Sequence, residues 1–135
     1  MFKHLRAYAL AAALALAAPM AAYAADLTIT STSTVKGSNA RTERGVAGVA
    51  ITAGQAVYYD SATARYKLSD ADSATVAARS VRGIALNTAA IGQPVEVQFG
   101  GDLTLGATLT ANTPYFLSGT AGGIAPIADV GAGEY

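Results

Sequence analysis

The sequence predicts a small all-β protein, built as a barrel or a sandwich of short strands. Short apolar runs alternate with turn-forming residues at regular intervals along the chain. One turn-and-strand pattern occurs three times. Val95–Phe99 alternates apolar and polar side chains, which is the period of a half-buried strand. The length of 135 residues argues for one domain.

The repeated pattern joins a tight turn to a strand. It occurs first in Ile51–Ser61, its Gly-Gln-x-Val core recurs in Ala90–Val97, and a Thr-Ala-turn-aromatic version occurs in Leu109–Gly119. A Gly or Asn in each copy permits the positive φ of a tight turn, and the β-branched and aromatic residues that follow favour a pleated surface. The residues predicted to carry this turn-and-strand motif are Gly54, Gln55, Val57, Gly92, Gln93 and Val95.

The first and third copies are 58 residues apart, which indicates an internal repeat. The same offset relates Tyr66 to Ile124. Applied to the expected strand Val81–Leu86, it gives positions 139–144, beyond the last residue, Tyr135. Either the repeat is imperfect or the chain is a fragment that lacks a C-terminal strand. Both readings leave a strand edge unpaired, which another subunit would cover.

Residues 1–24 have the pattern of a secretory signal peptide, and we expect this leader to be helical. The segment opens with three basic residues, Lys3, His4 and Arg6. An apolar run over residues 7–18 follows, Pro19 ends it, and a small-x-small site predicts cleavage between Ala24 and Ala25. The alternative is a retained Ala-rich helix. Because the apolar run is short and broken by proline, we expect no stable membrane span after the leader is removed.

The mature chain divides into a polar extended arm, residues 25–45, and a β domain, residues 46–135. Ser and Thr dominate Asp26–Val35, and such a polar strand specifies its register poorly. Arg41–Gly45 is the one dense charge cluster of the sequence. It reads either as a solvated loop or as an arginine contact to a partner's carboxylates. The residues predicted to contact a partner are Lys36, Arg41, Glu43 and Arg44.

The remaining elements follow from turn signals and local patterning. Asp70–Ser73 begins a polar link that could start a short helix ending near Arg79, with Asp72 or Ser73 as its cap. The expected strands are, in chain order, Val46–Ile51, Val57–Tyr59, Arg65–Leu68, Ser80–Leu86, Val95–Phe99, Asp102–Leu105, Tyr115–Leu117 and Ile124–Ile127. The second and third of these form one predicted hairpin, and the last two form another.

Composition excludes several classes of function. Without the leader, seven basic residues stand against nine acidic ones, so there is no electrostatic footprint for nucleic acid. The chain has no cysteine, which removes disulfides and thiolate metal sites. Charged residues make up only 13% of the chain, and alanine inflates the apolar fraction of 52%. A modest core of this kind is often completed by oligomerisation.

The sequence carries no recognisable catalytic or metal-binding motif. Its single histidine lies in the leader, so a general base would have to be a carboxylate or a lysine. Asp70 and Asp72 could open a calcium loop, but the Gly and Glu that such a loop needs do not follow. Strand tyrosines could stack sugars or bases, although their positions favour packing: Tyr58, Tyr59, Tyr66 and Tyr115. We therefore predict no enzyme, no metal and no cofactor.

Several segments, taken in order, resemble a known family. They are Ile51–Tyr59, Ser80–Leu86 and Ile91–Val97, followed later by Thr113–Gly119. Together with the opening Ala25–Thr30, they are similar to the small capsid decoration, or cement, proteins of tailed phages and prophages, a β-rich domain long described as being of unknown function. The likeness covers most of residues 25–135. It implies a structural protein, often a trimer, that binds the outside of an assembled head without chemistry.

Two functional hypotheses follow from the sequence. The first is a virion structural protein that binds the major capsid protein or other shell subunits as a homo-oligomer, expected to be a trimer on the virion surface. The second is an exported β-domain binding module in the periplasm or outside the cell, with carbohydrate as its ligand. The leader favours the second hypothesis, because the decoration family does not ordinarily carry a signal peptide.

Overall fold

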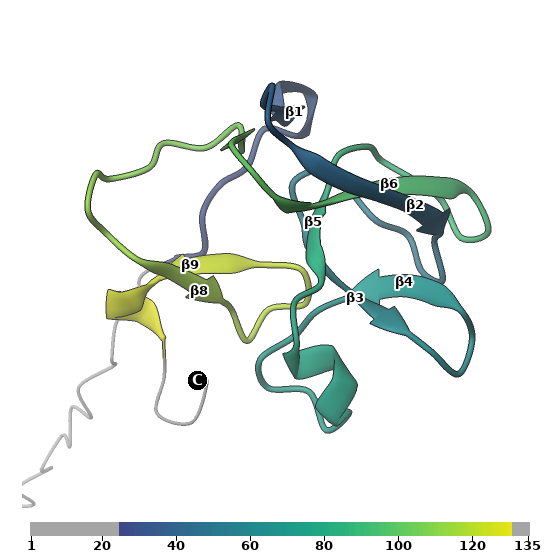
Figure 1. The fold of residues 1–135 in the computed structure, drawn as a ribbon. Coiled ribbons are helices and arrows are strands. Elements are labelled where there is room, and N and C mark those ends of the chain that lie inside the picture. Colours follow the sequence, from purple (N-terminus) through teal and green to yellow (C-terminus); the bar gives the residue numbers. More distant parts are fainter. Residues whose placement is uncertain (1–24, 131–135) are drawn as a thin grey trace, which may run out of the picture.

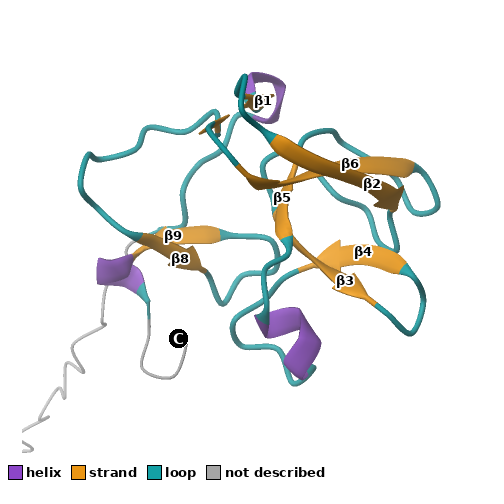
Figure 2. Cartoon of the chain, in the orientation of Figure 1, coloured by secondary structure: helices purple, strands orange, loops and turns teal. Residues whose placement is uncertain are grey.

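The computed structural model describes residues 25–130, and these form a β-rich domain of short strands (Figures 1 and 2). The predicted leader and its cleavage position at Ala24 lie outside the described residues. Within residues 25–130, the helical elements are three short 3₁₀ turns: η1 (Ser31–Ser33), η2 (Val76–Arg79) and η3 (Ile127–Asp129). None of the helices in this part of the chain is long and apolar enough to cross a membrane.

A five-stranded antiparallel sheet forms the centre of the domain. Its strands are, in spatial order, β2 (Arg41–Val46), β6 (Pro94–Gly100), β5 (Gly83–Ala85), β3 (Ala56–Asp60) and β4 (Arg65–Leu68). Immediately after β2, Ala47 forms a parallel bridge with Tyr66 of β4. The Gly48 N–H also donates a hydrogen bond to the Tyr66 carbonyl, with an N···O distance of 2.7 Å. The chain therefore brings the two edge strands of the sheet together.

The main buried cluster lies on one face of this sheet and is made largely of small and β-branched side chains. Val95 and Val97 of β6 are buried, as the alternation of the sequence predicts. Phe99 belongs to the same alternation but is 41% exposed, because β6 continues beyond the core. The buried cluster consists of Ala47, Ile51, Val57, Tyr66, Ala85, Ala89, Val95 and Val97.

Both predicted hairpins are confirmed, and they repeat one another in register. In the first, Val57 of β3 pairs with Leu68 of β4. In the second, β8 (Tyr115–Leu117) and β9 (Ile124–Pro126) pair antiparallel, with Tyr115 opposite Pro126. These pairs are related by the 58-residue offset of the sequence. One backbone hydrogen bond also repeats at this offset. The N–H of residue 69 donates to the carbonyl of residue 56 at 3.0 Å, and the N–H of residue 127 donates to the carbonyl of residue 114 at 3.1 Å.

The N-terminal segment binds along the second half of the chain. The Leu27 N–H donates to the Ile124 carbonyl at 2.8 Å. Further on, β1 (Val35–Lys36) pairs with β7 (Leu103–Thr104). Residues 41–45, placed in the polar arm by the sequence, form most of β2, so the predicted boundary between arm and domain falls inside a strand of the central sheet.

Two local predictions need correction. The apolar stretch Val46–Ile51 is no strand beyond Val46; it makes only the bridges of Ala47 and Ile51, because it turns between β2 and β3. The expected short helix is the 3₁₀ turn η2, whose N-cap is Thr75 and has no side-chain capping bond. Asp72 and Ser73 lie in the preceding turn, so neither caps it.

Candidate functional site

The glycines and the asparagine of the repeated pattern have the backbone role that the sequence predicts. Gly54, Gly92 and Asn112 have φ values of +94°, +82° and +60°. In each turn the residue after the Gly or Asn donates its N–H to the carbonyl of the residue three positions before it. The N···O distances are 3.2, 3.0 and 3.3 Å. Positive φ at the third position is the requirement of a type II turn.

The glutamines of the pattern cap their own turns, which the sequence did not reveal. The Gln55 Oε1 atom accepts a hydrogen bond from the Thr52 N–H at 2.7 Å, and Gln93 Oε1 accepts one from Ala90 at 3.0 Å. In the third copy the Tyr115 hydroxyl accepts from the N–H of the equivalent residue, at 2.9 Å. The motif residues are therefore structural, and Val57 and Val95 that follow them are core residues.

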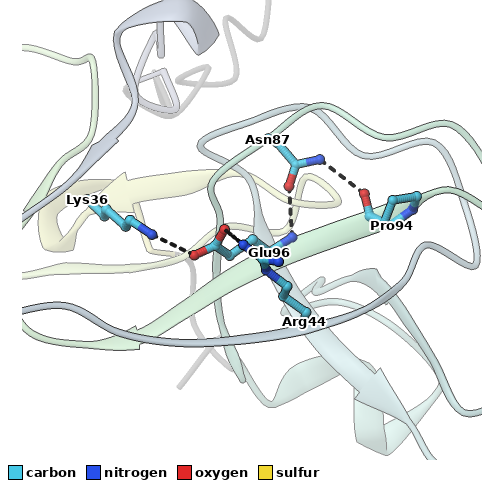
Figure 3. A network of polar contacts seen from close by, with 5 residues as sticks. All are labelled: Lys36, Arg44, Asn87, Pro94 and Glu96. Atoms are coloured by element: carbon cyan, nitrogen blue, oxygen red, sulfur yellow. Dashed lines mark hydrogen bonds and ion pairs between the residues drawn. The ribbon is translucent and has the colours of Figure 1, made fainter.

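The charge cluster of the sequence lies on β2, where successive side chains point to opposite faces of the sheet. On one face, Glu96 of β6 accepts a hydrogen bond from Lys36 at 2.9 Å and forms an ion pair with Arg44 at 3.5 Å (Figure 3). The Asn87 side chain supports this arrangement: its Oδ1 accepts from the Glu96 N–H at 2.7 Å, and its Nδ2 donates to the Pro94 carbonyl at 3.1 Å (Figure 3).

These contacts already occupy two of the four predicted partner-contact residues. The hydrogen bond from Lys36, followed by one from Thr42, lowers the pKa of Glu96. The Arg44 side chain is 81% exposed, so its ion pair is screened by water and adds little stability. Arg41 is exposed opposite Gly100 and makes no ion pair with any described residue.

On the other face of β2, Glu43 organises a second network. The Arg82 guanidinium donates to Glu43 through Nε and Nη2, both at 2.6 Å, which is the bidentate geometry of a strong arginine–carboxylate pair. The Tyr66 hydroxyl donates to the same carboxylate. Arg82, and to a smaller degree Tyr66, hold the pKa of Glu43 down to about 2 against the cost of burial. Burial first, and then Glu43, raises the pKa of Tyr66 to about 12.

Aromatic rings surround the Arg82 side chain. Its Cζ atom lies 5.0 Å from the ring centroid of Phe99, within the range of a cation–π contact. A hollow of about 350 Å³ on one side is lined by Arg82 with Glu43, Tyr59 and Tyr66. The rings of Tyr59 and Tyr66 meet edge to face, with centroids 5.3 Å apart.

A second hollow, of about 360 Å³, borders Arg82 as well and includes Val81 and Phe99. Tyr59, Val81 and Phe99 are 47%, 46% and 41% exposed. We call the area formed by Glu43, Tyr59, Tyr66, Val81, Arg82 and Phe99 the Arg82 surface. Its tyrosine, phenylalanine and arginine side chains are of the types that are enriched where proteins bind one another.

Of the residues predicted to contact a partner, only Glu43 belongs to this surface; the sequence also named Tyr59 and Tyr66, as residues that could stack sugars or bases but whose positions favour packing. Arg82 lies 39 residues further along the chain, and only the β2–β6–β5 pairing brings the two together. The signal that could have found Phe99 is the clean alternation of β6, which runs one step past the buried Val97. Of the four tyrosines considered, Tyr58 and Tyr66 are buried as packing predicts, and Tyr59 is the exposed one.

The described residues offer no obvious site for a metal ion, since no three His, Cys, Asp or Glu side chains gather within this part of the chain. The Asp70 carboxylate accepts a hydrogen bond from the Asp72 N–H at 2.9 Å, as in a simple turn. Comparison with protein-family models, with curated proteins and with solved structures finds no match to the chain.

Proposed function

We propose that the chain is a structural protein that binds the surface of an assembled protein shell, as a capsid decoration subunit does, and that it performs no catalysis. The observation that carries this proposal is the Arg82 surface: exposed aromatic side chains around a fixed arginine on a small β domain. The resemblance of the sequence to the decoration proteins of tailed phages names the kind of shell.

The Arg82 surface is suited to binding because its central charge is held in place before a partner arrives. Both nitrogens that face Glu43 are bound at 2.6 Å, and Phe99 covers the guanidinium. A side chain that is already ordered loses less entropy on binding, so more of the contact energy appears as affinity. Arg41 lies at the same end of β2 and β6, opposite Gly100, and extends the surface with an exposed charge.

The central sheet provides a rigid base for this surface. We infer that it functions as a small barrel, closed by the bridge between Ala47 and Tyr66. Closure removes two sheet edges, and a rigid base keeps the contact residues in one geometry. The core behind it is built largely of alanine and valine, which favours oligomerisation, and we propose a trimer on the shell.

The test measures binding to expanded, empty heads assembled from the major capsid protein of the phage or prophage that encodes the chain. Sedimentation separates bound from free protein. We expect Tyr59→Ala with Phe99→Ala to reduce occupancy at least tenfold, since truncating a binding hot spot costs roughly 2 kcal/mol or more. Val76→Ala is the matched control, because Val76 is 75% exposed on η2, outside the surface. Equal occupancy for all three proteins contradicts the proposal.

A second function is favoured by Tyr59, whose half-exposed ring lies beside the carboxylate of Glu43 and the guanidinium of Arg82. An aromatic face next to polar groups is also suited to a sugar ring, as an exported carbohydrate-binding module requires. A glycan array decides this point: binding that is lost in Tyr59→Ala supports the module, and an empty array excludes it. Intact mass and cell fractionation add a second criterion, because a chain that begins at Ala25 outside the cytoplasm favours the module.

A further inference from the structure

The first half of the chain shows which segment covers the turn-and-strand unit. Residues 51–57 pair antiparallel with residues 83–89. Ile51 and Ala89 exchange two backbone hydrogen bonds of 2.9 Å. The Ala85 N–H donates to Gln55 at 3.0 Å, and the N–H of residue 82 donates to Val57 at 2.7 Å. The covering segment buries Ile51, which is 1% exposed.

The second half repeats this unit without its cover. By the 58-residue offset, Leu109 is equivalent to Ile51, Thr113 to Gln55 and Tyr115 to Val57. Within residues 25–130, the carbonyls of these three residues accept no hydrogen bond. The N–H of Leu109 donates none within the same range. Leu109 is 50% exposed, against 1% for its buried equivalent. The segment that leads into β8 runs along the outside of the domain (Figure 1).

The other outer edges of the two hairpins are occupied. In the first hairpin, Gly48 donates to the outward carbonyl of Tyr66 in β4. In the second, Leu27 donates at 2.8 Å to the equivalent carbonyl, that of Ile124 in β9. Among the described residues, the edge of residues 109–115 is thus the hairpin edge that no segment covers. An uncovered edge of this kind pairs readily with an extended chain.

We propose that the edge of residues 109–115 binds an extended segment of a partner protein, which pairs antiparallel with it as residues 83–89 pair with residues 51–57. The template defines the chemistry of this segment: a small residue opposite Tyr115, an aliphatic residue opposite Pro114 and a small residue opposite Thr113, in the places of Gly83, Ile84 and Ala85. Main-chain hydrogen bonds supply affinity, and the side-chain pattern supplies selectivity.

This proposal is separate from the Arg82 surface, with which the edge shares no residue. The failure of one leaves the other in place. The exposed Leu109 gives the edge an apolar contact that the partner segment covers, as Ala89 covers Ile51 in the first half. A Leu109→Ser variant therefore weakens binding without removing any hydrogen bond of the folded chain.

The probe is a fluorescent ten-residue peptide with the sequence of residues 81–90, added to the full chain and followed by anisotropy. Two N-methylated versions form a matched pair. Methylation at Ala85 removes the N–H that the template directs at Gln55, and methylation at Leu86 removes the one directed at Glu96, on the opposite side of the peptide. We expect the Ala85-methylated peptide to bind roughly tenfold more weakly than the Leu86-methylated one.

Amide hydrogen exchange locates the bound peptide. We expect added protection at the N–H of Leu109 and no added protection at that of Ile51, which is bonded already. Leu109→Ser lowers the affinity, and Ile91→Ser, at another exposed aliphatic residue, leaves it unchanged. Absence of binding, equal binding of the two methylated peptides, or indifference to Leu109→Ser overturns the proposal. Self-association of the chain that Leu109→Ser abolishes assigns the edge to a second copy and overturns the partner assignment.

Discussion

Gly45 is a residue at which one added methyl group should lower the stability of the domain. A Cβ atom at this position would lie 2.5 Å from Cε2 and 2.8 Å from Cδ2 of Tyr66. Ordinary contact begins near 3.4 Å, so the ring would have to move by roughly 1 Å. Tyr66 cannot move freely, because it is 4% exposed and its hydroxyl is bound to Glu43. Overpacking of this kind costs about 1–3 kcal/mol.

The assay is thermal unfolding of Gly45→Ala beside Gly100→Ala, a matched change in the neighbouring strand. At position 100 the nearest atom to an added Cβ, Arg41 Nε, is 3.6 Å away, which is ordinary contact. For a domain of this size 1 kcal/mol shifts the melting temperature by about 4–8 °C, so Gly45→Ala should melt roughly 5–20 °C lower. Gly100→Ala should stay within about 0.5 kcal/mol of the parent. Equal melting temperatures for the two variants would refute the reasoning.

Three further predictions concern charge and turns. The pKa of Glu43 is lowered on folding, so the stability that its carboxylate gives the folded chain is complete above about pH 4.5 and is lost as the pH falls toward 2. The melting temperature of Glu43→Gln should therefore depend less on pH across that range than that of the parent. Parallel melting profiles of the two proteins would contradict this. Gln93→Ala removes the cap of the Ala90 N–H and should cost about 1 kcal/mol in urea unfolding, whereas no change would show that water replaces the cap. Arg41→Ala with Arg44→Ala should weaken attachment to expanded heads without changing the melting temperature, and unchanged occupancy would exclude these residues from the contact.

Local chemistry was sufficient to predict most of the strands, both hairpins and the repeat. Gly54, Gly92 and Asn112 are where the backbone needs positive φ, and the apolar residues that follow them form the strands. The two hairpins also have the same pairing register at an offset of 58 residues, because strand register follows from turn length and side-chain alternation.

Pairing between distant segments could not be predicted. Nothing within residues 41–46 indicates that they pair with residues 94–100. Because of this pairing, residues that the sequence placed in the arm form a strand of the central sheet. The Arg82 surface escaped prediction for the same reason, since Glu43 and Arg82 meet only across β6 and β5. Polar residues of β2 also concealed the strand, because apolar alternation is the signal by which strands are recognised.

The position of the N-terminal segment has a consequence for how the chain folds during synthesis. Its partners are late segments: Leu27 bonds to Ile124, Val35 pairs with Thr104, and β2 pairs with β6. On the ribosome this segment, which is made before the rest of the domain, must therefore stay unpaired until nearly the whole domain has been made. Contacts so distant in sequence slow folding and leave strand edges exposed meanwhile. The scarcity of large apolar residues in Ala25–Val35 keeps this waiting segment soluble until its partners emerge.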